Sequence, residues 1–270
     1  MPEGHVIHRL ANTLNEDFRG KDLQVTSPQG RFAAEAALLD EHSIARAETF
    51  GKHLFVDFDI DHPEHIVYIH LGLIGTLRFE PLEDYWGQMR LRIATDTQAA
   101  NLRGPQFCRL ITDAEMQAIV DRTGEDPLRA DARPAELWPR VKRSKRSIGS
   151  LLMDQKYFAG VGNIYRAETL FRLGVSPFAA GSSLSTELFD EIWADLVHLM
   201  RIGVERGRID TVRDEHLPEA MGREPRKDDH GGEVYVYRRA GLPCYVCGAP
   251  IMEKVMEGRN LFWCPSCQQR

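Results

Sequence analysis

The sequence predicts a mixed α+β protein in which a β-rich half precedes a helical half and a small cysteine-bearing tail. Three observations lead to this fold class. Hydrophobic residues recur with a period of two in several short segments between residues 53 and 111. They recur with a helical period from about residue 112 to residue 217. Two Cys-x2-Cys pairs follow near the end of the chain.

The first ten residues, MPEGHVIHRL, predict a helix that starts at about Glu3. Pro2 suits the beginning of a helix, because the N–H that proline lacks is not needed there. The spacing of Val6, Ile7 and Leu10 gives this helix an apolar face. Taken alone, these residues are a helix-start signal and nothing more.

Five segments predict strands, and their close spacing suggests a sandwich or a barrel-like domain. In the first of them, HLFVDFDI, Leu54, Val56 and Phe58 alternate with residues that would face the other side of a sheet. The five segments are 53–60, 66–70, 76–80, 88–93 and 107–111.

The pattern becomes helical near residue 112, with a start signal at Asp113 and a glycine stop at Gly124. A longer amphipathic helix is predicted within 185–207. Residues 218–232 are rich in proline, glycine and charge and predict a mobile loop. The residues expected on the core side of the long helix are Leu188, Ile192, Leu196, Leu199 and Met200.

Two cysteine pairs separated by sixteen residues match the spacing of a four-cysteine zinc site. Four thiolates leave no open position on the metal, so the zinc would be structural. The segment between the pairs, 250–263, predicts a hairpin, and Cys108 is expected to be a buried thiol. Disulfides are the alternative, disfavoured in a reducing compartment. The expected ligands are Cys244, Cys247, Cys264 and Cys267.

Composition sets limits on location and partners. The chain has 270 residues, of which 43% are hydrophobic and 27% charged, and it contains no run of about 20 apolar residues. We expect no membrane span, no secretory signal and a cytosolic, reducing environment. The net charge of −6 disfavours a nucleic-acid partner only weakly, because binding is local and residues 140–146 carry five basic side chains.

Two polar residues of the second half stand in patterns that suit phosphate binding. Gly160 and Gly162 precede Asn163 in AGVGNIY, where asparagine would cap a helix whose first N–H groups could bind a phosphate. Arg259 lies on the approach to the second cysteine pair. The alternatives are an ordinary turn between helices and a solvated surface arginine.

Five motifs, in order, resemble the formamidopyrimidine-DNA glycosylase / endonuclease VIII family over nearly the whole chain. They are PEG at 2–4, GKHLF at 51–55, HLGLIGTLRF at 70–79, LLMDQKYFAGVGNIYRAETLF at 151–171 and GRNLFWCPSC at 258–267. The resemblance implies an N-terminal catalytic β-sandwich domain with flanking helices at 1–122 and a linker at 123–134. It implies a helix–two-turn–helix DNA-binding domain at 135–232 and a zinc finger at 233–270, with one structural zinc ion.

The resemblance also implies a bifunctional DNA glycosylase and abasic-site lyase of base excision repair. Removal of Met1 would leave Pro2 with a secondary amine, partly neutral near pH 7, that attacks C1′ of the damaged nucleotide. The cationic iminium that forms acidifies the C2′ proton and permits β-elimination. Glu3 resembles the acid/base residue that assists base loss and opening of the sugar ring.

Five further residues stand at positions of the family motifs, and the resemblance implies a role for each. Lys52 resembles the lysine that contacts phosphate near the lesion and assists elimination. Arg259 resembles the zinc-finger arginine that grips phosphate and assists δ-elimination, which suits its permanent charge and planar fork. Asn163 and Arg122 resemble DNA-binding residues, the latter of the endonuclease VIII branch. Leu73 resembles the wedge that fills the gap left by the flipped base, with core packing as the alternative.

Differences between this sequence and the motifs of the two branches indicate which branch of the family it resembles more. The DPRRFG-like loop of the formamidopyrimidine branch is absent here, and NLRGPQFCRL leaves Arg103 and Phe107 as candidates to oppose the orphaned base. His5 stands where the endonuclease VIII branch often has proline. The R-x-G-x-D-x-L pattern beginning at Arg122 favours that branch. We therefore expect oxidised pyrimidines or abasic sites rather than 8-oxoguanine as the preferred substrate.

Three rival functions remain open at this point. The chain could be an idle, zinc-dependent sensor of DNA damage, a purine-specific glycosylase of the same family, or a zinc-stabilised structural protein with no nucleic-acid role. As a family member it is expected to be a monomer in a bacterial-type cytoplasm, associated with the nucleoid and with no membrane partner. Its partner would be damaged DNA, whether double-stranded, bubble or single-stranded.

Overall fold

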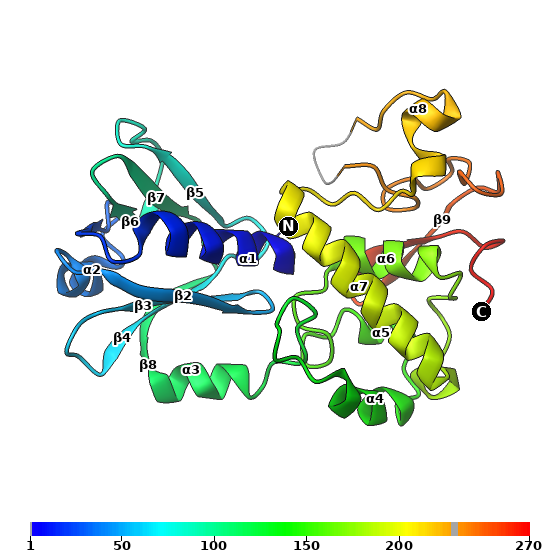
Figure 1. Cartoon of the computed structure of the whole chain (residues 1–270), viewed down its shortest axis with the longest axis horizontal. Coiled ribbons are helices and arrows are strands. Elements are labelled where there is room, and N and C mark those ends of the chain that lie inside the picture. Colours follow the sequence, from blue (N-terminus) through cyan, green and yellow to red (C-terminus); the bar gives the residue numbers. More distant parts are fainter. Residues whose placement is uncertain (1, 228–231) are drawn as a thin grey trace. The chain divides into compact units, whose positions relative to one another are not determined.

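A computed structural model describes residues 2–227 and 232–270 of the chain (Figure 1). The chain divides into two compact units, Met1–Thr123 and Gly124–Arg270, and each has its own buried hydrophobic core. The finer division of the second unit into a linker, a helical domain and a zinc finger stays a prediction. Within the described residues, no helix is both long and apolar enough to cross a bilayer.

The first unit contains two antiparallel four-stranded sheets that share one core, which confirms the predicted sandwich. Val56 and Phe58 of one sheet belong to the same buried cluster as Leu91 and Leu102 of the other. One sheet has the order β1-β6-β7-β5, built from β1 (Gln24–Thr26), β6 (Met89–Ala94), β7 (Gln98–Arg103) and β5 (Thr76–Pro81). The other has the order β2-β3-β4-β8, built from β2 (Ile44–Phe50), β3 (His53–Phe58), β4 (Glu64–His70) and β8 (Phe107–Thr112).

The simple alternation predicted for β3 is incomplete. Phe55, expected on the opposite face from Val56, is only 1% exposed. It belongs to a second small cluster with Ile66, Tyr68 and Ile111, against which Ile119 of α3 (Asp113–Val120) packs. This sheet is therefore buried on both faces over part of its area, a property that a period of two does not reveal.

The helices of the first unit are α1 (Gly4–Thr13), which continues as a short π-helix (Leu14–Phe18), α2 (Ala33–Leu39) and α3 (Asp113–Val120). Ile7 and Leu10 of α1 are buried, as expected. The cap of α3 is Thr112, not Asp113: the Glu115 N–H donates to the Thr112 hydroxyl and the Glu115 carboxylate accepts from the Thr112 N–H. The helix ends before Gly124. Sequence reasoning missed α2, β1, β2 and β7, because their apolar residues follow neither period clearly.

The second unit is mainly helical, and its long helix was predicted correctly. α7 (Thr186–Arg206) is capped by Ser185 and ends at Gly207, whose φ of 74° is in the left-handed region. All five residues predicted for its core side are buried. The other helices are α4 (Pro134–Lys142), α5 (Ile148–Leu151), α6 (Asn163–Arg172), α8 (Pro218–Met221) and the short 3-10 helices Gly181–Ser183 and Asp214–His216.

The cysteine-bearing tail contains the predicted hairpin. β9 (Met252–Met256) pairs antiparallel with β10 (Arg259–Trp263). The two residues of the turn, Glu257 and Gly258, have φ of 53° and 66°, which is the geometry of a type I′ turn.

The segment predicted as a mobile loop, 218–232, contains α8 and several polar contacts described below. Part of it, residues 228–231, lies outside the described residues. Its mobility stays a prediction.

Candidate functional site

The N-terminal end of α1 presents a proline and a buried carboxyl group. Glu3 is the N-cap residue of α1, and its side chain is almost fully buried although it forms no cap hydrogen bond. Pro2, half-buried, precedes it. Burial, with the charges of Arg9 and His8, lowers the pKa of His5 to about 4, so this imidazole is neutral near pH 7. The end of the helix therefore places Pro2 beside a buried carboxyl group.

Lys52 lies in the two-residue turn that joins β2 to β3, where Phe50 pairs with His53 and Gly51 has a φ of 61°. A positive φ at the first turn position favours glycine there. Burial lowers the pKa of His53 to about 4, with further contributions from the charges of His70 and Lys52. The pKa of His70 is lowered for similar reasons, with burial as the largest cause.

His53 and His70 were missed by sequence reasoning. Their ring centroids are 5.3 Å apart, and His53 Nδ1 is 2.9 Å from the Tyr68 hydroxyl. Two neutral imidazoles therefore lie in the electrostatic field of Lys52. Only the pairing of β3 with β4 brings them together, and no short sequence motif signals that pairing.

Leu73 lies in the turn after β4 and is 57% exposed, which excludes the core-packing alternative. The next residue, Ile74, is 84% exposed, so the turn presents two adjacent apolar side chains to solvent. A side chain at Gly75 would collide with the Leu71 carbonyl at 2.3 Å, so the turn requires glycine there. Apolar residues exposed in this way cost solvation energy and favour a binding role.

The two candidates for opposing an orphaned base differ in exposure. Arg103 is 9% exposed and is held by an ion pair with Glu80 at 2.8 Å. Its guanidinium also stacks on Trp86, with a separation of 3.9 Å from the ring centre. Phe107 is 44% exposed at the start of β8. The Arg103 side chain is thus held by contacts within the first unit, whereas the Phe107 ring is exposed and available to contact a ligand.

Arg122 lies just beyond α3, two residues before the boundary between the units. It is exposed, and its Nε donates a 2.7 Å hydrogen bond to the Ala118 carbonyl. Its exposed position is compatible with a role in binding.

The four predicted metal ligands lie together in the second unit. Their Sγ atoms are all within 4.8 Å of one another. The Cys244–Cys267 and Cys247–Cys264 separations are 3.9 and 3.4 Å, far longer than a disulfide bond. Tetrahedral zinc with bonds of about 2.3 Å requires sulfur atoms about 3.8 Å apart. The thiolates of this cluster fit one structural zinc ion, and Cys108 is buried elsewhere, as predicted.

A groove of about 520 Å³ brings Asn163 and Arg259 together within the second unit. Tyr237 and Arg238 line it too, and Arg238 is exposed. Sequence reasoning missed both as site residues, although they belong to a tail with more basic than acidic side chains. Asn260 completes the wall on the hairpin side. The groove also contains the carboxylate of Glu253, which accepts a hydrogen bond from the Asn260 side chain. Its two guanidinium groups outnumber this single carboxylate and, with a carboxamide and a phenol, can bind an anion.

The cap of α6 differs from the prediction. Gly162, not Asn163, is the N-cap residue, and Asn163 is the first residue of the helix itself. The Asn163 amide donates a 2.9 Å hydrogen bond to the Asn260 carbonyl, and its oxygen accepts one from Arg166. The carboxamide therefore joins α6 to the hairpin instead of capping its own helix.

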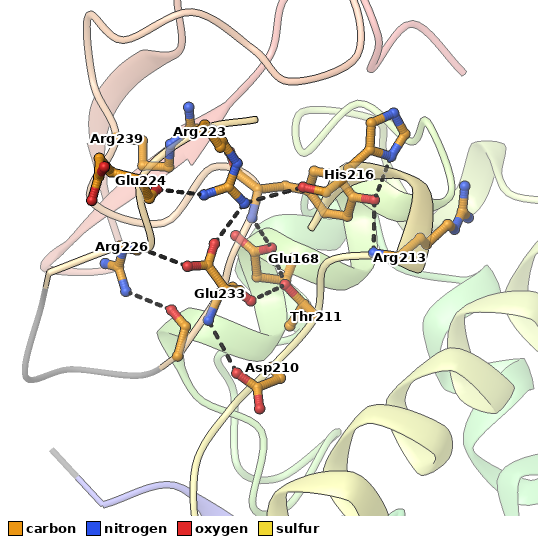
Figure 2. A network of polar contacts seen from close by, with 12 residues as sticks. Glu168, Asp210, Thr211, Arg213, His216, Arg223, Glu224, Arg226, Glu233 and Arg239 are labelled. Atoms are coloured by element: carbon orange, nitrogen blue, oxygen red, sulfur yellow. Dashed lines mark hydrogen bonds and ion pairs between the residues drawn. The ribbon is translucent and has the colours of Figure 1, made fainter. Parts of the chain in front are cut away.

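A buried carboxylate holds in place the backbone segment from which Tyr237 reaches the groove. Figure 2 shows Glu168 of α6 at the centre of a polar network. It accepts hydrogen bonds of 2.7 to 2.9 Å from the N–H groups of Tyr235, Val236 and Tyr237 and one of 2.6 Å from the Thr211 hydroxyl. Four donors compensate the burial of this fully enclosed side chain.

The same network continues towards α8. Arg223 forms a 2.6 Å ion pair with Glu233, which also accepts a hydrogen bond from the Arg226 N–H (Figure 2). Arg223 and Arg239 lie on Tyr245, with their guanidinium carbons 4.0 and 3.5 Å from the ring centre. These contacts tie the segment after α7 to the start of the cysteine-bearing tail.

Comparisons with known proteins cover nearly the whole chain. Residues 1–109 match the N-terminal domain of formamidopyrimidine-DNA glycosylase, and residues 123–214 match the H2TH domain of formamidopyrimidine-DNA glycosylase. Residues 241–270 match a zinc finger found in FPG and IleRS. Endonuclease 8 1 of Mycobacterium tuberculosis is 46% identical over 277 residues, covering 99% of this chain and 100% of that protein.

Formamidopyrimidine-DNA glycosylase of Thermus thermophilus is 31% identical over 276 residues, covering 99% of this chain and 98% of that protein. Its crystal structure superposes with a TM-score of 0.74 at 28% identity over 99% of this chain and 98% of that one. The Lactococcus lactis Fpg, solved with DNA containing an abasic site, gives a TM-score of 0.79 at 19% identity over 99% of this chain and 100% of that one, which shows a shared fold.

Proposed function

Since this chain belongs to the formamidopyrimidine-DNA glycosylase / endonuclease VIII family, we propose that it is a DNA glycosylase that also cleaves the strand at abasic sites. The observation that carries this proposal is the Pro2–Glu3 pair at the start of α1, with the Glu3 side chain 2% exposed. A sensor of damage without chemistry would not need a nucleophile at this end of the helix.

Pro2 acts as the nucleophile after Met1 is removed. Its amine forms a bond to C1′ as the bond from C1′ to the base breaks, and the base leaves with a proton. Opening of the sugar ring then breaks the C1′–O4′ bond, with O4′ taking up a proton. This leaves an iminium that has no N–H proton to lose, because the proline nitrogen already carried two carbons. Loss of the C2′ proton then expels the 3′ phosphate by β-elimination, and a second, δ-elimination expels the 5′ phosphate. Hydrolysis of the remaining iminium would regenerate the amine.

Glu3 supplies the proton transfers that base loss and opening of the sugar ring require. Its enclosure suits this role, because an acid/base group must be positioned and shielded from bulk water. Lys52 contacts a phosphate near the lesion and assists elimination. The neutral imidazoles of His53 and His70 leave Lys52 as the cationic group among these three side chains.

The groove that contains Asn163 and Arg259 binds the DNA backbone. Arg259 supplies a fixed positive charge and a bidentate fork for phosphate. Arg122 adds a further backbone contact. Leu73 enters the gap that the flipped base leaves, a role to which its 57% exposure lends support.

We favour oxidised pyrimidines and abasic sites as substrates, because Endonuclease 8 1 is 46% identical while the formamidopyrimidine-DNA glycosylase of Thermus thermophilus is 31% identical. The second candidate is a purine-specific glycosylase, which the name of the latter protein suggests. We further propose a monomer that acts on damaged DNA in association with a bacterial nucleoid.

Trapping with borohydride tests the proposal. Wild-type protein mixed with abasic duplex DNA and sodium borohydride is expected to form a covalent adduct, because reduction fixes the iminium. Pro2→Gly and a form extended before Pro2 are expected to lose it. A wild-type protein that starts at Pro2 and traps none of a panel of abasic, oxidised-pyrimidine and 8-oxoguanine duplexes would overturn the enzymatic function.

A further inference from the structure

Arg166 of α6 is a fully buried arginine that bonds to Asn163 of the groove but does not line the groove itself. Its guanidinium donates to three oxygens from three parts of the fold. One is the Asn163 side-chain oxygen, and the others are the carbonyls of Gly149 in α5 and Met256 in β9, each at 3.4 Å. The side chain therefore joins α5, α6 and the turn of the hairpin.

The hairpin turn lies against α5 at the same place. The Ser150 hydroxyl bonds to the Glu257 carboxylate, which also lies 3.5 Å from Arg146. A side chain at Gly149 would come within 2.8 Å of the Pro177 carbonyl and 3.2 Å of the Met256 sulfur. Glycine at this position therefore accommodates Pro177 first and the Met256 side chain second, and Arg166 bonds to Met256, the residue just before the turn.

Two groove residues depend on these contacts. Asn163, which accepts the bond from Arg166, donates to the Asn260 carbonyl at 2.9 Å. Arg259 follows the turn directly, three residues after Met256. One guanidinium therefore restrains both the carboxamide on the helical side of the groove and the backbone that carries the arginine on the hairpin side.

We propose that Arg166 is the positioning residue of this groove, setting the separation of the Asn163 and Arg259 side chains to match DNA phosphates. This rests on the proposed binding of DNA by the groove. Arginine is suited to the task, because its rigid planar fork can donate in several directions at once, whereas a lysine ammonium is a single point with a flexible stem. The effect reaches DNA only through Asn163 and Arg259.

The test measures equilibrium binding to a duplex with a tetrahydrofuran abasic analogue, by fluorescence anisotropy at several salt concentrations. Arg166→Lys keeps the charge and is expected to weaken binding about tenfold. Arg172→Lys is the matched control. Arg172 is on the same helix, with its Nε 2.9 Å from Asp195, and it does not line the groove. Its replacement is expected to change affinity by about twofold or less.

A double-mutant cycle separates positioning from general stability. In a protein that already carries Asn163→Ala and Arg259→Ala, Arg166→Lys is expected to change DNA affinity by about twofold or less, because the groups through which it acts are gone. Equal weakening in both backgrounds would overturn the proposal. So would equal weakening by Arg172→Lys, or wild-type affinity in Arg166→Lys.

Zinc content and the melting temperature establish that each variant is folded, and Arg166→Gln replaces Arg166→Lys if the latter is not. If neither folds with its zinc, Arg166 is required for folding itself, which would also overturn a positioning role. Borohydride trapping at saturating DNA is expected to persist in Arg166→Lys. Failure of trapping in the wild type would refute the proposed chemistry, whereas the binding cycle tests Arg166 alone.

Discussion

The side-chain amide of Asn163 donates a 2.9 Å hydrogen bond to the backbone carbonyl of Asn260, which joins the first turn of α6 to the second strand of the zinc hairpin. The same carboxamide accepts from the buried Arg166. A residue expected to meet phosphate therefore also fastens two parts of the second unit. Its replacement should affect stability as well as binding.

Asn163→Ala should lower the free energy of unfolding by about 1–3 kcal/mol, because it leaves a buried guanidinium and a carbonyl without this partner. Urea denaturation measures the effect. Asn260→Ala is the control, since it keeps the backbone carbonyl and should change stability by less than about 0.5 kcal/mol. Equal losses in the two variants would contradict the structural role of the Asn163 amide.

Glu3→Gln should separate the two proposed activities. Excision of an intact oxidised base should fall by about a hundredfold or more, because base loss requires proton transfer by a positioned acid. Trapping on a preformed abasic site should be less affected, since the base is already lost and the open-chain aldehyde can react with the Pro2 amine directly. Single-turnover cleavage of the two substrates measures this, and equal losses on both would argue against the assigned role.

Glu168→Gln should loosen the segment that carries Tyr237. The neutral amide keeps the size of the side chain but weakens three backbone hydrogen bonds, and hydrogen bonds to charged groups contribute about 1.5–3 kcal/mol. We expect faster amide hydrogen exchange at residues 235–237. Glu191→Gln on α7, whose carboxylate is 45% exposed, should leave that exchange unchanged.

His65 should make the stability of the first unit depend on pH. Burial alone would lower its pKa, but bonds to Asp57 at 2.6 Å and Asp113 at 3.1 Å outweigh burial and raise it. The protonated imidazole therefore stabilises the fold fully below the unfolded pKa of about 6.5, and this stabilisation is lost as pH rises through the folded pKa. His65→Gln should abolish this part of the pH dependence in thermal melts, whereas His62→Gln should retain it.

Cys264→Ser should remove the metal and disrupt the hairpin. The wild type is expected to contain one zinc ion per chain, bound by the four cysteines. The free energy of zinc binding contributes directly to the stability of so small a hairpin. Phe262 and Cys264 are buried in the core of the second unit, so loss of the metal should also lower its melting temperature. Cys108→Ser, outside the cluster, should keep the zinc. Full zinc content in Cys264→Ser would refute the ligand assignment.

Much of the fold could be predicted from local patterns. The spacing of the cysteine pairs predicted a cluster that the Sγ positions fit, and the period of α7 predicted all five of its core residues. Local signals were weaker for β7, whose residues 99–103 are all buried. Both faces of this strand are buried, and Asn101 and Arg103 on one face bond to Glu80 within the same sheet, so alternation of apolar and exposed polar residues cannot reveal it.

The sequence by itself determined the groups to which we assign the chemistry, a proline and a glutamate at the start and an arginine in the hairpin, and the four cysteines of the metal site. Only the tertiary structure decided which other residues these groups contact. In the folded chain the Asn163 carboxamide donates to the Asn260 carbonyl and does not cap its own helix. Tyr237 and Arg238 line the groove, and Arg103 forms an ion pair with Glu80. The physical reason is that periodicity and capping rules describe neighbours along the chain, whereas these contacts join residues far apart in sequence and form only when whole elements pack.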